Sequence, residues 1–173
     1  MFELRLSEKM LLALLRSSLH QEKADTAFFS NVSSDDWQAC YQLAVSQGVK
    51  ALAWEGVMTL PAALQPPKAL KLNWALSVEA CEKRYRRYCQ VADELSRFYA
   101  AYGIAMLQIK GVGYSSLYPV PSHREGGDID IYTYAAPGSG MTDTEANALA
   151  DRLMQNKGIE VDTRRNVKHS EFY

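Results

Sequence analysis

The chain has 173 residues, 47% of them hydrophobic, which suffices for one domain with a proper core and a helical extension. A formal net charge of -1 excludes an overall electrostatic field that attracts nucleic acid, so such binding would need a local patch. Three cysteines without a C-x-x-C pair argue against a disulfide framework or structural zinc, and no apolar run approaches the about 20 residues of a membrane span. We therefore expect a cytoplasmic protein without a membrane partner.

The first part of the chain reads as a helical region, residues 1–102. Apolar spacing predicts helices over residues 4–19, from Ser33 or Ser34 onward, over 51–60 and over 68–102. Asp35 and Asp36 would lie in the first turn of the second helix, where acidic side chains are favoured. Gly103 closes the long pattern.

The character of the sequence changes at Ile104. The pattern predicts strands over residues 104–109 and 128–134, a brief helix over 114–117 between them, and later strands over 159–162 and from His169. Thr142 or Thr144 would cap a helix that ends at Asn156, with Glu145 as its acidic partner. The expected fold class is therefore α+β, with a small mixed sheet in a core over residues 103–173.

Asp128 and Asp130 are the candidate metal ligands. Side chains two positions apart on a strand point to the same face, so these carboxylates would project together. They would repel each other unless a cation lies between them. Magnesium binds one or two carboxylates together with substrate phosphate oxygens, so the pair predicts a seat for a nucleotide-bound metal. Alone the pair is weak evidence, because polar faces of antiparallel strands carry similar pairs.

Three neighbouring features strengthen the metal-site interpretation. Lys110 and Gly111 follow an expected strand directly and open a turn into a helix, a geometry whose free N–H groups suit phosphate. Arg124 lies just before Gly126 and Gly127, which leave room for a bulky triphosphate. The interval between the glycines and the acids is short, so both are expected to line one cleft.

Other polar residues have plainer interpretations. The basic stretch over residues 83–87 is flanked by acidic residues, which is typical of a solvated helix face. His123 is interpreted as a loop cap, with a phosphate contact as the alternative.

Four spaced elements carry a resemblance to a known family. They are Leu107-Gln108-Ile109-Lys110-Gly111, Leu117-Tyr118-Pro119, Arg124 and Gly127-Asp128-Ile129-Asp130-Ile131. Together they resemble the uncharacterised bacterial nucleotidyltransferase family, which belongs to the polymerase-beta-like nucleotidyltransferase superfamily. The resemblance is sharpest over residues 104–134 and extends more loosely to His169, where the family shows a histidine-containing segment.

The resemblance implies transfer of a nucleoside monophosphate from a nucleoside triphosphate to an acceptor, with pyrophosphate leaving. Asp128 and Asp130 would be the catalytic residues and would hold two Mg²⁺ (or Mn²⁺) ions. The implied nucleotide-binding residues are Lys110, Gly111, Gly113, Arg124 and Gly127. A small molecule or a protein is expected as acceptor ahead of RNA, because the chain is nearly neutral.

Two departures from the family pattern bear on activity. Val112 stands where the superfamily usually carries serine or a second glycine, so a hydroxyl contact to phosphate would have to come from Ser115 or Ser116.

The third carboxylate of the superfamily lies on a later strand. Glu160 and Asp162 come too early for this role, and Glu171 is a weak candidate. The sequence therefore predicts that the third acid lies beyond Tyr173 and that the polypeptide is a fragment of a longer protein. The alternative function is a catalytically degenerate module that binds nucleotide or a protein partner.

Overall fold

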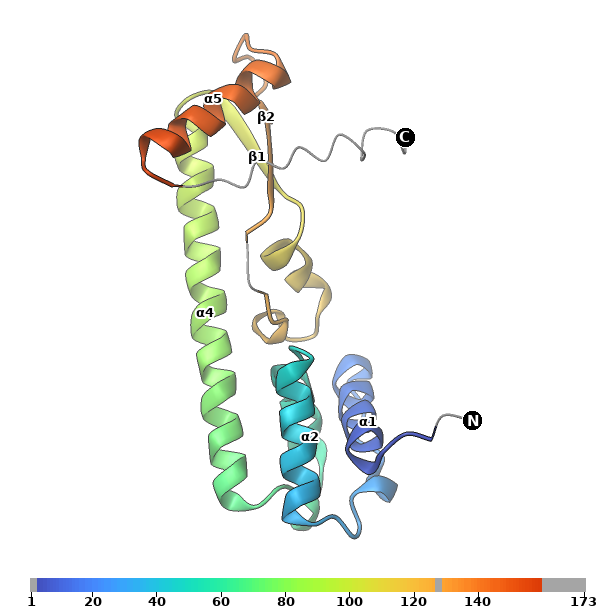
Figure 1. Ribbon diagram of the computed structural model, residues 1–173. Helices are drawn as coiled ribbons and strands as arrows, with labels where there is room; N and C mark the ends of the chain where they lie inside the picture. Colours follow the sequence, from blue (N-terminus) through green and yellow to red (C-terminus); the bar gives the residue numbers. More distant parts are fainter. Residues whose placement is uncertain (1–2, 127–128, 160–173) are drawn as a thin grey trace. The chain divides into compact units, whose positions relative to one another are not determined.

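The computed structural model describes residues 3–126 and 129–159, which are mainly helical (Figure 1). The helices are α1 (Leu6–His20), α2 (Ser34–Ser46), α3 (Lys50–Thr59), α4 (Lys68–Ala100) and α5 (Asp143–Asn156), and the strands are β1 (Ile104–Gln108) and β2 (Ile131–Ala135). Short 3-10 helices are η1 (Thr26–Phe28), η2 (Ala62–Leu64), η3 (Gly111–Leu117) and η4 (Pro121–His123). The predicted α+β class is confirmed. None of the described helices combines the length and the apolar character needed to cross a membrane.

The chain forms two compact units. The first combines the residues up to Val91 with Ile109–Asp130, and the second combines Ala92–Gln108 with the residues from Ile131 onward. The division falls inside α4, so this helix contributes to both units. The domain boundary expected between residues 102 and 103 stays a prediction.

Local hydrogen bonds set the starts of α2 and α5. The Ser33 hydroxyl accepts from the Asp36 N–H at 3.2 Å, while the Ser33 N–H donates to the Asp36 carboxylate at 3.0 Å. Thr142 and Glu145 form the same reciprocal pair at α5. Both pairs are capping boxes, which satisfy N–H groups that the first helical turn leaves without partners. The predicted starts of both helices are confirmed.

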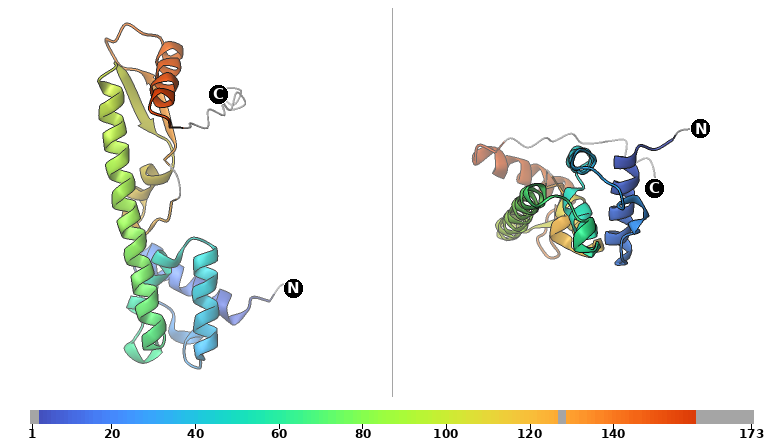
Figure 2. Two further views of the ribbon diagram at one scale, coloured as in Figure 1. Left: turned by 60° about the vertical axis from the view of Figure 1, so that its left-hand side comes forward. Right: turned by 90° about the horizontal axis from the view of Figure 1, so that it is seen from below.

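Aromatic side chains centre the core of the first unit, where α1, α2 and α3 lie beside the first part of α4 (Figure 2). Trp74 of α4 is fully buried and contacts the rings of Trp37, Tyr41 and Trp54. Its Nε1–H donates to the carbonyl of Lys50 at 2.8 Å, so the polar edge of the ring is also satisfied.

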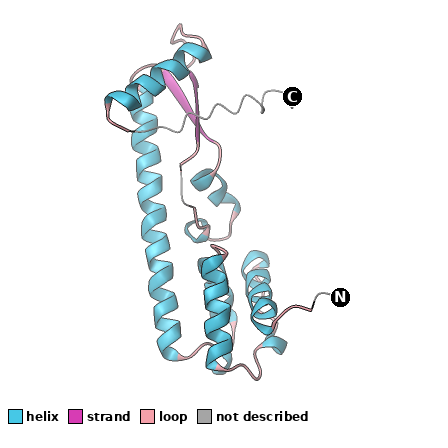
Figure 3. Cartoon of the chain, viewed as in Figure 1, coloured by secondary structure: helices cyan, strands magenta, loops and turns pink. Residues whose placement is uncertain are grey.

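The second unit is built on an antiparallel strand pair, the only sheet among the described residues (Figure 3). Gln108 pairs with Ile131 at one end of the register and Ile104 with Ala135 at the other. The small buried core consists of Tyr99, Ile104, Ala146, Ala150 and Met154, from the end of α4, from β1 and from α5.

Two details differ from the expectations, and a third prediction falls outside the described residues. β2 begins at Ile131, later than the predicted start at residue 128, because its paired register with β1 runs only from Ile131 to Ala135. The apolar spacing of α4 included Leu72, yet its side chain is 62% exposed. The strands expected after Gly158 fall on residues that lie, apart from Ile159, outside the described part of the chain.

Candidate functional site

The turn that contains Lys110, Gly111 and Gly113, called the glycine turn below, follows β1 and belongs to the first unit. The Ile109 N–H donates to the carbonyl of Asp130 at 3.0 Å, so the segment before β2 lies next to the segment after β1. Gly111 is buried and has a φ of +64°, a left-handed conformation that side chains with a Cβ rarely adopt. The turn therefore requires glycine at position 111, and η3 starts there.

Arg124 reaches back to this turn. Its Nη1 donates to the carbonyl of Gly111 at 2.8 Å. Gly126 lies beside the contact, since a Cβ built there would stand 3.4 Å from Arg124 Nη1 and 4.0 Å from Gly111 Cα. A guanidinium carries five N–H donors, so the bond to Gly111 uses only part of its capacity.

The structure brings several predicted site residues together. Lys110 is exposed, and its ammonium makes no hydrogen bond or ion pair with any described residue. The Gly113 N–H donates to the Lys110 carbonyl at 3.2 Å, so this amide is engaged within the turn. Asp130 is half-buried next to Ile109. Gly127 and Asp128 lie outside the described residues.

Ser115 and Ser116 have different surroundings. Ser115 is buried, and its hydroxyl lies 2.5 Å from the Val112 carbonyl, to which it donates, and 3.1 Å from the hydroxyl of Tyr85. It therefore links the turn to α4 and is not placed to replace the missing phosphate-binding hydroxyl. Ser116 is exposed, with its hydroxyl 3.3 Å from the Gly113 carbonyl.

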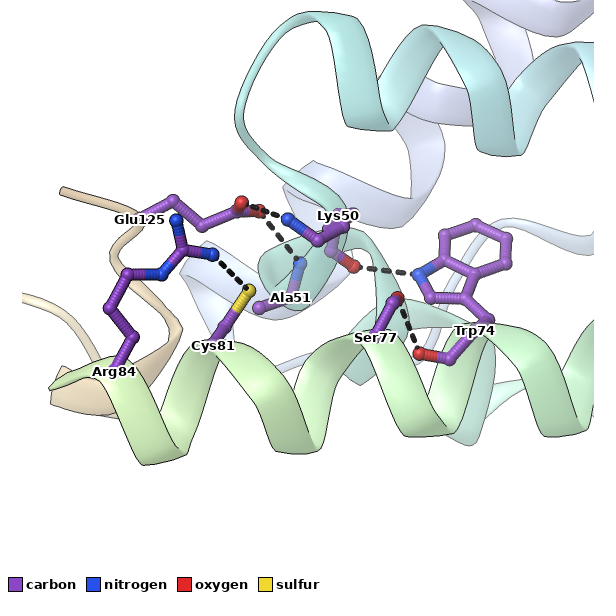
Figure 4. A network of polar contacts seen from close by, with 7 residues as sticks. All are labelled: Lys50, Ala51, Trp74, Ser77, Cys81, Arg84 and Glu125. Atoms are coloured by element: carbon purple, nitrogen blue, oxygen red, sulfur yellow. Dashed lines mark hydrogen bonds and ion pairs between the residues drawn. The ribbon is translucent and has the colours of Figure 1, made fainter. Parts of the chain in front are cut away.

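A narrow pocket lies where α4 faces the turn. Its volume is about 20 Å³, and Arg84, Tyr85, Arg124 and Gly126 are among the residues that line it. A cavity of that size has room for about one water molecule. The Arg84 guanidinium also donates to the sulfur of Cys81 at 3.9 Å (Figure 4).

The residues on either side of Arg124 are tied to the helices. His123 Nδ1 lies 2.8 Å from Glu55 Oε1 of α3, and its Nε2 lies 3.2 Å from Glu82 Oε1 of α4. Glu125 forms an ion pair with Lys50 and accepts from the Ala51 N–H at 3.3 Å (Figure 4).

The pKa of Lys50 reflects this setting. Burial alone would lower it, but hydrogen bonds and charge interactions with Glu125 and Cys81 outweigh burial, so the pKa of Lys50 lies above its ordinary value. Lys50 therefore stays charged at neutral pH.

Comparison with known protein families assigns the chain to one of them. The family model described as uncharacterised nucleotidyltransferase matches residues 33–173. The chain belongs to this family. Neither the curated proteins nor the solved structures contain a match to the chain. The matched region includes α2, α3 and α4 as well as the glycine turn, and membership supports a nucleotidyltransferase-like function.

Nucleotidyltransferases usually use divalent metals such as Mg²⁺, which is bound mainly by carboxylate and phosphate oxygens. Among the described residues, no group of three or more His, Cys, Asp or Glu side chains is placed to hold a metal ion. Asp130 is the described member of the predicted pair, and carboxylate oxygens are the ligands that Mg²⁺ prefers. Asp130 thus supplies one carboxylate of this kind among the described residues, and the metal-binding pair stays a prediction.

Some residues near the glycine turn were not indicated by the sequence. Arg84 was part of a stretch interpreted as a solvated helix face, and the ion pairs of Lys83 with Glu79 and of Arg86 with Glu82 agree with that interpretation. Arg84 itself lines the pocket. Its place at helical spacing from the buried Cys81 is the one local hint.

Proposed function

We propose that this nucleotidyltransferase family member transfers a nucleoside monophosphate from a nucleoside triphosphate to an acceptor, with release of pyrophosphate. The observation that carries the proposal is the contact of Arg124 with the Gly111 carbonyl at 2.8 Å. The bond from the Ile109 N–H to the Asp130 carbonyl supports the proposal further, because Arg124, Gly111 and Asp130 all belong to the first unit.

Each residue has a distinct part in the proposal. Asp128 and Asp130 would hold Mg²⁺ or Mn²⁺, which would neutralise charge on the reacting phosphates. Lys110 and Arg124 would bind phosphate oxygens through their N–H donors. The glycines at 111, 113 and 127 would let the triphosphate approach the backbone.

The pocket volume indicates where the triphosphate would lie. A space of about 20 Å³ beside Arg124 is too small for a nucleotide. Lys110 and Gly113 are exposed on the turn. The proposed phosphate position is therefore the solvent-facing side of the turn, beside Lys110 and Gly113.

The acceptor is proposed to be a small molecule or a protein hydroxyl. A net charge of -1 supplies little attraction for an RNA backbone, whose binding is dominated by phosphate contacts. A cytoplasmic location is part of the same proposal.

The reaction predicts that label from the α-phosphate, and not from the γ-phosphate, is retained on the acceptor. The chain would be incubated with Mg²⁺ and each nucleoside triphosphate labelled at either position, together with a lysate as acceptor source. We expect α-label in an acceptor and equimolar pyrophosphate. Asp128→Asn with Asp130→Asn should reduce incorporation at least about 100-fold, on the scale of losing a catalytic charge. Asp35→Asn, at an exposed carboxylate of α2, is the matched control and should retain activity.

Incorporation of γ-label would contradict nucleotidyl transfer and indicate a phosphotransferase. A catalytically degenerate nucleotide-binding module is the second candidate, favoured by the engagement of the Ser115 hydroxyl with Val112 and Tyr85. Magnesium-dependent binding without transfer of either label would support this second candidate.

A further inference from the structure

The side chains of three consecutive residues leave the backbone in alternate directions. His123 contacts Glu55 and Glu82 on the helices, Arg124 contacts the glycine turn, and Glu125 contacts Lys50. Arg124 has an extended backbone, with φ of -75° and ψ of 104°. In extended backbone, residues two positions apart point to the same side, so His123 and Glu125 share one direction while Arg124 points toward the glycine turn.

The contacts on the helix side are buried. His123 is 7% exposed, and the side chains of Lys50 and Glu125 are 13% and 14% exposed. Removing one partner of a buried charged pair leaves the other without compensation, so such groups strongly favour the arrangement in which they meet. Residues 123 and 125 are therefore held in place from two helices.

His123 and Glu125 are unsuited to touch a nucleotide themselves. Both ring nitrogens of His123 face carboxylates, and both oxygens of Glu125 accept hydrogen bonds, from Lys50 and from the Ala51 N–H. An imidazole ring presents its two nitrogens in different directions, which allows His123 to connect Glu55 of α3 with Glu82 of α4. Arg124, which lies between them, is the residue through which they would act on a substrate.

We propose that His123 and Glu125 are positioning residues that hold Arg124 on the Gly111 turn, and that α3 and the first part of α4 are the scaffold of the nucleotide site. The part of this proposal that concerns nucleotide binding rests on the proposed function. Fixing Arg124 before substrate arrives lowers the conformational entropy that binding would otherwise cost. The helices thus act on nucleotide affinity without contacting the nucleotide.

The first test is a double-mutant cycle on the Kd for a nucleoside triphosphate. The probe is whichever of ATP, GTP, CTP or UTP the wild-type chain binds in the presence of Mg²⁺. His123→Gln and Glu125→Gln should each raise Kd about tenfold in the wild-type background. In the Arg124→Ala background, the same substitutions should change Kd less than about twofold, because the group through which they act is gone. Losses of equal size in both backgrounds would overturn the proposal.

A matched control separates positioning from stability. Val57→Ala removes buried methyl groups from α3 in the same core, so it should lower the midpoint of thermal unfolding without changing Kd. Glu79→Gln removes an exposed α4 carboxylate and should change neither quantity by much. If Val57→Ala weakened nucleotide binding as much as His123→Gln, the effect would be one of stability and the proposal would be wrong.

Amide hydrogen exchange tests the proposal without any nucleotide. The N–H groups of His123 and Arg124 donate to the carbonyls of Val120 and Pro121 at 2.9 and 3.3 Å. In His123→Gln and Glu125→Gln, exchange of these amides should accelerate at least about tenfold while that of α1 stays unchanged. Unchanged exchange would overturn the positioning claim. A wild-type chain that binds no nucleotide would contradict the proposed function alone, and exchange would still decide the positioning claim.

Discussion

Gly56 shows how one residue sets the distance between two helices. A Cβ at this position of α3 would stand 2.7 Å from the Cα of Leu14 and 2.8 Å from its carbonyl carbon, both in the backbone of α1. Backbone atoms cannot relieve such a contact by changing rotamer, as a flexible side chain can. The close approach of α3 to α1 therefore depends on the missing side chain.

We predict that Gly56→Ala destabilises the first unit. Alanine raises helix propensity by about 1 kcal/mol over glycine, but forcing a methyl group into a packed interface costs about 1–3 kcal/mol or more. Because α1 must shift bodily, the second effect should exceed the first, with a net loss of about 1–2 kcal/mol in the free energy of unfolding. Denaturation in urea measures the difference.

Gln42→Ala is the control for this substitution. Gln42 is an exposed residue of α2, and alanine there should change the free energy of unfolding by no more than about 0.5 kcal/mol. An increase in stability for Gly56→Ala would contradict the close packing of α1 and α3.

Single residues of the candidate site were predictable to different degrees. Lys110, Gly111 and Arg124 are close along the chain and carry a recognisable pattern, and the structure brings them together. His123 was interpreted as a loop cap, whereas its partners Glu55 and Glu82 are 68 and 41 positions away. No local pattern reports contacts at such separations, so its role emerged only from the fold.

Among the helices and strands, the predictable boundaries are those set by hydrogen bonds between residues only three positions apart. The capping pairs of α2 and α5 involve residues three positions apart, and both starts were predicted. The start of β2 was not, because it depends on where the partner strand ends. The exposure of Leu72 likewise depends on which face of α4 meets the other helices.

The capping pair of α2 predicts a dependence of stability on pH. Hydrogen bonds from the side chain and the backbone of Ser33 lower the pKa of Asp36. A lowered pKa in the folded state contributes stability at pH values above the ordinary pKa of Asp, and this contribution is lost as pH falls through the lowered value. Wild type should therefore be more stable than Asp36→Asn at neutral pH, and the two should converge in acid.

Ser33→Ala removes the other half of this pair. It should lower the free energy of unfolding by about 1 kcal/mol at neutral pH, as is usual for loss of an N-cap. Urea denaturation between neutral pH and pH 3 measures both variants, with Gln42→Ala as the variant whose effect should not change with pH. A constant difference between wild type and Asp36→Asn at all pH values would contradict the hydrogen-bonded pair.

In the whole molecule, the first unit combines two segments that are distant in the sequence, the residues up to Val91 and Ile109–Asp130. Ile109–Asp130 carries the family pattern and packs with the N-terminal helices, although Lys50 and Glu125 are 75 positions apart. The family match over residues 33–173 includes these helices. The helices up to Val91 and the glycine turn are thus parts of one structural unit.

We propose that Asp128, Asp130 and the glycine turn bind a nucleoside triphosphate together with a divalent metal. Calorimetric titration of the chain with each nucleoside triphosphate, with Mg²⁺ and with a chelator, tests it most directly. We predict binding heat for at least one nucleotide that requires Mg²⁺. Binding should be lost in the double variant Asp128→Asn with Asp130→Asn and retained in Asp35→Asn. Absence of magnesium-dependent heat for every nucleotide, or undiminished binding by the double variant, would contradict the account.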